Sequence, residues 1–241
     1  MLHGEQRRQV HLSFSIPSEC ARQIEAGDID VGLVPVAEIA RQGLTVVAEV
    51  GIACFGAVRS ILLFSRVPWR SVRTLAADAS SRTSVQLARI ILHEQFAAEP
   101  KILEHEPVLE DMLARADAAL VIGDPALTLN ASELPYECLD LGEEWQRLTA
   151  LPMVFAAWAS KHDQSSMAAI ANESYRFGES RMEEIIEAEY AKRGISRELA
   201  ARYLRQHIRF ALGAKEMEGL RTFLHFAGLA RGGDVYATTR G

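Results

Sequence analysis

The chain has 241 residues, of which 49% are hydrophobic and 24% are charged. This length and composition are typical of a globular protein with a sizeable core in one large domain or two small ones, and they exclude a disordered chain. The formal net charge of −6 argues against general nucleic-acid binding, because a phosphate backbone is met by a basic protein face. We therefore expect a small-molecule partner and no nucleic acid.

The amino-terminal stretch HGEQRRQ is polar, whereas a signal peptide carries an apolar run of about 7 to 15 residues. The apolar runs elsewhere are shorter than the roughly 20 residues that span a bilayer. We therefore expect a cytoplasmic protein without membrane insertion. Cys20, Cys54 and Cys138 form no C-x-x-C pair, so we expect them to pack as small hydrophobic residues.

The first part of the chain alternates predicted strands and helices. Val10 to Ile16 alternates apolar and polar residues, which predicts a half-buried strand, and Pro17 then begins a helix. Val31 to Val34 is an apolar run typical of a strand buried on both faces, and Pro35 ends it. Further elements are expected in this part as a helix at 36–41 and strands at 45–50, 54–56 and 60–65.

After Pro68 the pattern restarts, which indicates a second lobe. Its expected elements are strands at 74–77, 101–105, 118–122 and 138–140, helices at 83–96 and 108–114, a turn at 141–144 and a returning strand at 153–158. Alternation of strands and helices predicts mostly parallel pairing. We assign residues 1–70 and 156–241 to lobe 1 and residues 71–155 to lobe 2, with a ligand cleft between them.

The carboxyl-terminal third is predicted to be helical, with apolar stripes at 167–178, 179–193, 197–212 and 215–229. Each stripe is narrow enough to face a single core. We therefore favour a cover of lobe 1 over the alternative, a dimer surface.

The stretch from Asp78 to Ser84 is the most informative for function. A strand end is followed by small hydroxyl residues at a helix start, so backbone N–H groups and hydroxyls surround one point. A simple helix cap would explain one of these residues. Arg82 and the hydroxyls of Ser81, Thr83 and Ser84 go beyond a cap and favour a carboxylate site.

Two further segments are secondary candidates. Asp124 follows a buried strand and precedes Pro125, a pattern that helix capping alone explains, although the carboxyl ends of parallel strands also form ligand crevices. Arg59 and Ser60 precede an apolar strand, and Arg59 is expected to project a second cation toward the cleft.

Motifs for metal and cofactor chemistry are missing from the sequence. The seven histidines form no H-E-x-x-H, and there is no G-x-G-x-x-G, P-loop or G-x-S-x-G. We therefore expect neither a metal nor a cofactor. A binding protein and an enzyme that relies on positioned polar groups both remain open.

Six strings together resemble the chorismate dehydratase family of the futalosine route to menaquinone: PSECARQIEAGDIDVGLVPVAE, GAVRSILLFSRVP, DASSRTSVQLARIIL, ADAALVIGDPAL, LDLGEEWQRLTALPMVFAAWA and HIRFALGAKEMEGLRTF. The resemblance implies an α/β, two-lobed fold like that of type II periplasmic binding proteins, with mixed, mostly parallel sheets and a helical carboxyl-terminal segment. It also implies that the family's first strand, inside the sheet of lobe 1, is missing here.

The resemblance implies a cofactor-free elimination of water from chorismate, which gives 3-[(1-carboxyvinyl)oxy]benzoate. We take Ser84 and Asp124 as candidate catalytic residues. The candidate substrate-binding residues are Pro35, Arg59, Ser60, Ser81, Arg82, Thr83 and Ser84. The alternatives are a non-catalytic carboxylate-binding protein of the same fold and the related 1,4-dihydroxy-6-naphthoate synthase.

Overall fold

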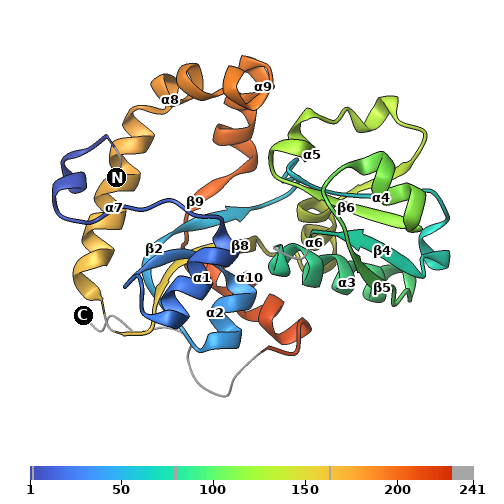
Figure 1. Cartoon of the computed structure of the whole chain (residues 1–241), viewed down its shortest axis with the longest axis horizontal. Helices are drawn as coiled ribbons and strands as arrows, with labels where there is room; N and C mark the ends of the chain where they lie inside the picture. Colours follow the sequence, from blue (N-terminus) through green and yellow to red (C-terminus); the bar gives the residue numbers. More distant parts are fainter. Residues whose placement is uncertain (2, 79–80, 163, 230–241) are drawn as a thin grey trace.

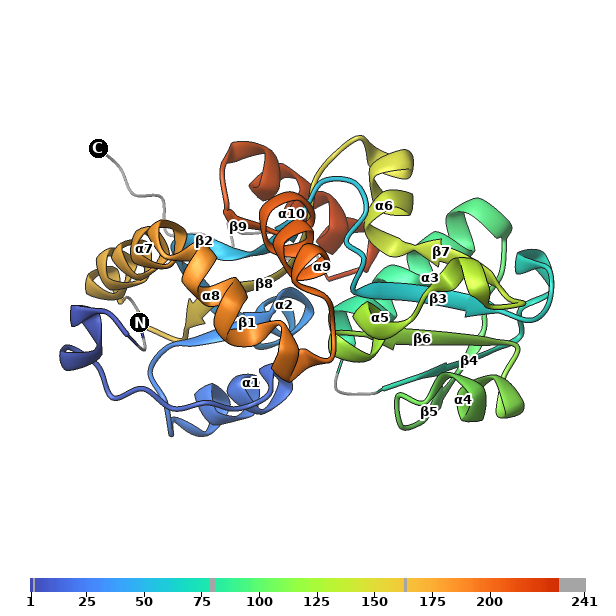
Figure 2. The ribbon, with the colours of Figure 1, turned by 90° about the horizontal axis from the view of Figure 1, so that it is seen from above.

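The computed structural model describes residues 1, 3–78, 81–162 and 164–229, and these residues form two lobes, each built on its own sheet. Lobe 1 contains the sheet β1-β8-β2-β9, and lobe 2 contains the sheet β5-β4-β6-β3-β7. Figure 1 and Figure 2 show the two lobes side by side. The expected two-lobed α/β fold with a helical carboxyl-terminal segment is confirmed.

Lobe 1 is formed by both ends of the chain. Its strands are β1 (Gly32–Pro35), β2 (Thr45–Cys54), β8 (Met153–Ser160) and β9 (Arg209–Ala211). Its helices are η1 (Glu5–Arg8), α1 (Pro17–Ala26), α2 (Val36–Gln42), α7 (Ser165–Ser180), α8 (Met182–Glu189), η4 (Ala191–Arg193), α9 (Arg197–Arg202), η5 (Tyr203–His207) and α10 (Ala214–Phe226).

Lobe 2 is a single continuous stretch of chain. Its strands are β3 (Ile61–Ser65), β4 (Thr74–Ala77), β5 (Lys101–Glu104), β6 (Ala118–Ile122) and β7 (Glu137–Asp140). Its helices are η2 (Trp69–Ser71), α3 (Arg82–Phe96), α4 (Leu109–Arg115), α5 (Asp124–Thr128), η3 (Ala131–Glu133) and α6 (Leu141–Thr149).

The prediction of mostly parallel pairing is wrong, although the sheets taken together are mixed. Among the described residues, only β4 with β5 and β4 with β6 pair in parallel. The other pairings are antiparallel because β8, which returns from lobe 2, lies between β1 and β2, and because β3 and β7 carry the chain into and out of lobe 2. The alternation of strands and helices along the sequence shows which elements follow one another. It does not show where a strand that returns from the other lobe enters a sheet.

Sheet membership also corrects the lobe boundaries at 70/71 and 155/156. Strand β3, at Ile61–Ser65, pairs with β6 and β7 and so belongs to lobe 2. Strand β8 already begins at Met153 in lobe 1. The chain therefore crosses between the lobes at 55–60 and at 150–152.

The strand predicted at Val10 to Ile16 is not formed. Residues 11–16 have no regular secondary structure, and the side chains of Phe14 and Ile16 are 75% and 62% exposed. A strand is stable only when a neighbour takes up its backbone hydrogen bonds, and no described strand pairs with this segment.

Two other predicted elements differ. The segment predicted as a turn at 141–144 begins helix α6, because the Asp140 carboxylate accepts hydrogen bonds from the backbone N–H groups of Gly142 and Glu143. The helix predicted to reach residue 212 ends with a π-helical turn at His207, and β9 then pairs with β2. The strand predicted at 45–50 continues to Cys54 as β2, and residues 55–56, predicted as part of a separate strand, form a bend after it.

The core of lobe 2 follows the two-residue period of its strands. Leu63, Leu75 and Leu120 face α3 and α6 and join an apolar cluster that continues into lobe 1. Phe64 and Val121 face the opposite side and pack with α4. Because both faces are covered, these strands read as continuous apolar runs in the sequence.

The junction between the lobes is apolar. Trp145 on α6 is fully buried, and its ring meets Phe223 on α10 edge-on at a centroid distance of 6.1 Å. Its indole N–H donates to the Pro152 carbonyl oxygen at 3.1 Å. A Cβ atom at Gly219 would lie 1.9 Å from the same oxygen, so α10 can approach the crossing segment only with glycine there.

Within the described residues, no helix is long and apolar enough to cross a membrane. Cys54 is buried, whereas Cys20 and Cys138 are partly buried, and all three are free thiols. Burial, followed by the nearby Asp140 charge, raises the pKa of Cys138 to about 11.

Asp117 is predicted to stabilise lobe 2 in a pH-dependent way. Its carboxylate accepts hydrogen bonds from the backbone N–H groups of Arg73 and Thr74, each at 3.0 Å, and from the Thr74 hydroxyl. Burial raises the pKa of Asp117, but these hydrogen bonds outweigh burial, so the net shift is downward. The stabilisation is therefore present at neutral pH and lost as the pH falls through the lowered pKa.

We expect Asp117→Ala to lower the free energy of unfolding by about 1–3 kcal/mol at pH 7. In urea titrations the difference in unfolding free energy between the wild type and Asp117→Ala should become smaller at about pH 3, below the ordinary aspartate pKa. Substitution of the exposed Asp111 by alanine is the control. An equal gap at both pH values would contradict this role.

Candidate functional site

One edge of the lobe 2 sheet gathers the candidate residues of that lobe. Strands β4, β5 and β6 are parallel, so their carboxyl ends share an edge, and β3 begins there because Ile61 pairs with Ile122. This edge therefore carries Asp78, the start of α3, Asp124, and the pair Arg59 and Ser60. The sequence reasoning placed these segments together, and the ends of parallel strands are where open α/β sheets bind ligands.

The start of helix α3 is enclosed and contacts lobe 1. The side chains of Thr83 and Ser84 are buried, and the Thr83 hydroxyl accepts the backbone N–H of Ala37 from lobe 1 at 3.3 Å. Ser81 stands at the N-cap, but its side chain accepts no capping hydrogen bond. Simple capping therefore does not account for these hydroxyls. Pro35 is buried just before Ala37, on the lobe 1 side.

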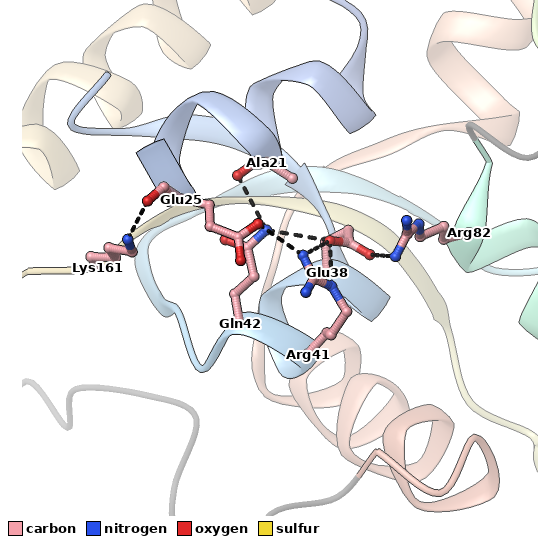
Figure 3. A network of polar contacts seen from close by, with 7 residues as sticks. All are labelled: Ala21, Glu25, Glu38, Arg41, Gln42, Arg82 and Lys161. Atoms are coloured by element: carbon pink, nitrogen blue, oxygen red, sulfur yellow. Dashed lines mark hydrogen bonds and ion pairs between the residues drawn. The ribbon is translucent and has the colours of Figure 1, made fainter. Parts of the chain in front are cut away.

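Arg82 contacts lobe 1 through an ion pair. Its Nη1 atom lies 2.9 Å from Oε1 of Glu38, a buried carboxylate on α2 (Figure 3). The other oxygen of Glu38 accepts hydrogen bonds from Arg41 and Gln42 on its own helix. Arg82 itself is more than half exposed, so its guanidinium can exchange Glu38 for another carboxylate.

Arg59 does not project a cation into the cleft. Its guanidinium donates to the carbonyl oxygens at the end of α5, at 2.9 Å to Ala126, and also to those of Leu127 and Leu129. Its backbone has a φ of +65°, a left-handed conformation that costs a non-glycine residue about 1 kcal/mol or more. Asp140 holds this conformation, because its carboxylate accepts the backbone N–H groups of Val58 and Arg59 at 2.9 and 2.6 Å.

Ser60 is buried and forms part of a contact that the sequence reasoning missed. The hydroxyl of Tyr203, on η5, donates to Oγ of Ser60 at 3.0 Å. Burial raises the pKa of Tyr203, so its hydroxyl stays protonated at neutral pH. The apolar spacing around Tyr203 indicated only a core residue, whereas η5 is a π-helical turn, a feature frequent at functional sites.

Asp124 also forms an ion pair with lobe 1. Its Oδ2 atom lies 2.8 Å from Nη1 of Arg193 on η4, and both side chains are about half exposed. Asp124 is the first residue of α5 and Gly123 is its N-cap, so the prediction that Asp124 caps the helix is wrong by one position. As a proton acceptor it would first have to leave Arg193.

A polar hollow of about 500 Å³ lies at the ends of β4 and β5. It is lined by Asp78, Glu104, His105, Glu106 and Arg115 from lobe 2 and by Ile16 from lobe 1. The sequence reasoning read His105 only as part of a strand. Its Nδ1 atom lies 2.8 Å from the backbone carbonyl oxygen of Glu106.

The groups at the start of α3 fit recognition of a small anion. The start of a helix, Arg82 and several hydroxyls are the donors that carboxylates bind. Among the described residues, no group of three or more His, Cys, Asp or Glu side chains is arranged to hold a metal ion.

Solved structures place the two-lobed architecture in the class of proteins with the periplasmic-binding-protein fold. The alkanesulfonate-binding protein SsuA of Xanthomonas axonopodis has a TM-score of 0.62 at 12% identity and covers 94% of this chain and 87% of its own. The aliphatic sulphonate binding protein of Escherichia coli has a TM-score of 0.60 at 14% identity, with coverages of 93% and 78%. A protein of Archaeoglobus fulgidus reaches 0.67 at 18% identity, with coverages of 91% and 85%.

Within this class, the chain belongs to the menaquinone biosynthesis family, whose model matches residues 2–228. It is similar to a chorismate dehydratase of Thermus thermophilus, with 29% identity over 235 residues that cover 89% of this chain and 86% of the relative. The family resemblance of the sequence is confirmed.

We predict that the Arg59 guanidinium stabilises the folded protein. Arg59→Met keeps the length of the side chain but removes the donors to the α5 carbonyl oxygens, so we expect the free energy of unfolding to fall by about 1.5–3 kcal/mol. Arg70→Met, at an exposed arginine of the same lobe, is the matched control for urea titration. If Arg59→Met keeps its stability, the carbonyl contacts do not matter.

Proposed function

We propose that this protein is a chorismate dehydratase of menaquinone biosynthesis, a cofactor-free hydro-lyase. The observation that carries the proposal is the match to the family along nearly the whole chain, together with the relative named chorismate dehydratase. The polar sheet edge supports it, because chorismate carries two carboxylates and the start of α3 offers Arg82 and several hydroxyls as donors.

The reaction breaks a C–H bond and a C–O bond at two neighbouring carbons of the ring. A proton leaves the carbon that carries the enolpyruvyl ether, and the hydroxyl of the neighbouring carbon leaves with a proton as water. The electron pair of the C–H bond becomes the new ring double bond, which completes the aromatic ring, so no redox partner is needed. The protein has to bind the dianion, exclude bulk water and hold donors beside the departing hydroxyl.

In this proposal, the start of α3 and Arg82 bind one substrate carboxylate, with Ser81, Thr83 and Ser84 as further donors. Binding would draw Arg82 away from Glu38, whose second oxygen keeps its partners on α2. Ser84 and Asp124 remain the candidate catalytic residues. Ser60 accepts a hydrogen bond from Tyr203, and in this proposal its own hydroxyl proton is a further donor to the substrate.

The proposal predicts that the purified protein converts chorismate to an enolpyruvyl benzoate. Ultraviolet spectra should show a new aromatic absorber, and mass spectrometry should show the loss of one water. Binding of chorismate with thermal stabilisation but no product would instead favour the non-catalytic binding protein.

Arg82→Ala should weaken chorismate binding about 10- to 100-fold, since a charged hydrogen bond contributes about 1.5–3 kcal/mol. The matched control is Arg89→Ala, at an exposed arginine further along α3. Calorimetric titration would measure both variants. Equal affinities would place the carboxylate site elsewhere.

Tyr203→Phe should lower kcat/KM about 3- to 10-fold, the effect of one neutral hydrogen bond, while the melting temperature changes little. Because the pKa of Tyr203 is raised, the wild-type rate should show no loss from tyrosine ionisation up to about pH 9. Tyr136→Phe, at a partly buried tyrosine of lobe 2 whose hydroxyl donates to Glu110, is the control. An unchanged rate for Tyr203→Phe would remove the tyrosine from the site.

A further inference from the structure

Glu38 occupies the guanidinium of Arg82 at the start of α3. Figure 3 shows Arg82 directed at one oxygen of this carboxylate. The other oxygen accepts hydrogen bonds from Arg41 Nε at 2.9 Å and from Gln42 Nε2 at 3.3 Å. Among the described residues, Glu38 is the one hydrogen-bond partner of the Arg82 guanidinium. The arginine that we assign to anion binding therefore already holds a carboxylate of the protein itself.

The two partners of this ion pair are held differently. The Glu38 side chain is 5% exposed, and Arg41 and Gln42 fix it on α2. The Gln42 amide also donates to the Ala21 carbonyl oxygen at 3.1 Å, which ties this group to α1. The Arg82 side chain is 56% exposed, so a ligand in solution can reach it. When Arg82 leaves, Glu38 keeps two donors, which limits the cost of its buried charge.

A neighbouring contact keeps Glu38 within reach of Arg82. The Thr83 hydroxyl accepts the backbone N–H of Ala37 at 3.3 Å, and both residues are buried. Thr83 follows Arg82 and Ala37 precedes Glu38, so the start of α3 stays beside α2. Because the Glu38 carboxylate belongs to the same chain, its effective concentration at Arg82 does not fall on dilution. A ligand carboxylate that binds the same N–H groups must therefore exchange with Glu38.

We propose that Glu38 is an internal competitor that lowers the affinity of Arg82 for carboxylate ligands. The role rests on the carboxylate site of the proposed function and adds the residue that sets the affinity of that site. A ligand carboxylate and Glu38 make the same kind of charge-assisted hydrogen bond to Arg82, so the gain from one is offset by the loss of the other. Small monoanions are therefore held weakly, and a ligand needs further contacts at the start of α3 to displace Glu38.

The test measures the affinity of the full chain for benzoate, an aromatic probe with one carboxylate, by nuclear magnetic resonance titration. Glu38→Gln keeps the side-chain length and an accepting oxygen but removes the charge, so it should tighten benzoate binding about 3- to 10-fold. Glu25→Gln is the matched control, because it removes the same charge from the same network but at a residue that pairs with Arg41, at 3.2 Å. This control should bind benzoate like the wild type.

A double variant shows whether the gain acts through Arg82. Adding Glu38→Gln to Arg82→Ala should leave the affinity within about 2-fold of Arg82→Ala alone, since no guanidinium is left to compete for. Circular dichroism melting curves show whether each variant is folded. If Glu38→Gln does not fold, Glu38→Asp takes its place. It keeps the charge beside Arg41 but is one methylene too short to hold Arg82, and it should also tighten binding.

The proposal is overturned if the folded Glu38 variant binds benzoate no more tightly than Glu25→Gln, or if the gain persists without Arg82. Weaker binding would show that Glu38 orients Arg82 for the ligand, and it would overturn the proposal as well. So would the absence of saturable benzoate binding to both the wild type and the Glu38 variant. Chorismate turnover is measured separately. A wild type that makes no product but shows the expected benzoate affinities contradicts the proposed reaction and leaves the role of Glu38 in place.

Discussion

The carboxylate of Asp140 is the contact on which the candidate site depends. It accepts backbone N–H groups from both Val58 and Arg59 on the first crossing segment and from Gly142 and Glu143 at the start of α6. One side chain thus joins the chain that enters lobe 2 to the helix that leads out of it. Without an acceptor these N–H groups would lack partners, and the left-handed backbone of Arg59 would lose its support. Ser60 follows directly, so its position at the sheet edge is set by the same contact.

The lobes are held together unevenly. At the crossing segments, Trp145 and Phe223 form a buried apolar contact that cannot open without exposing aromatic surface to water. Away from this junction, the ion pairs of Arg82 with Glu38 and of Arg193 with Asp124 join the lobes, and their arginines are at least half exposed. Asp124 is also about half exposed, so water competes for both partners of its pair with Arg193, and that pair contributes little to stability. Glu38 is buried, but its second oxygen keeps hydrogen bonds from Arg41 and Gln42 without Arg82. These two ion pairs are therefore easier to separate than the apolar junction.

The sequence predicted the buried strands of lobe 2 almost to the residue, because an apolar run between turn residues reports burial on both faces. The prediction of a strand at Val10 to Ile16 was wrong. Alternating apolar and polar residues indicate one apolar and one polar face, but they do not show whether a neighbouring strand is present. The sheet edge could be predicted because turn residues mark the ends of the strands in the sequence, and Ser81 to Ser84 follow the end of β4. The role of Arg59 could not be read, since it depends on a left-handed backbone and on carbonyl oxygens more than sixty residues away. Tyr203 was missed because its spacing equals that of a core residue.

The π-helical turn η5 connects the carboxyl-terminal helices of lobe 1 to the first crossing segment. A π-helical turn closes its hydrogen bonds between residues five apart, one residue further than an α-helix. In this turn, the Tyr203 hydroxyl donates to Ser60, and the His207 ring contacts the Ala57 carbonyl oxygen. Both contacts attach η5 to residues 57–60. The position of Ser60 at the sheet edge therefore depends on η5 as well as on Asp140.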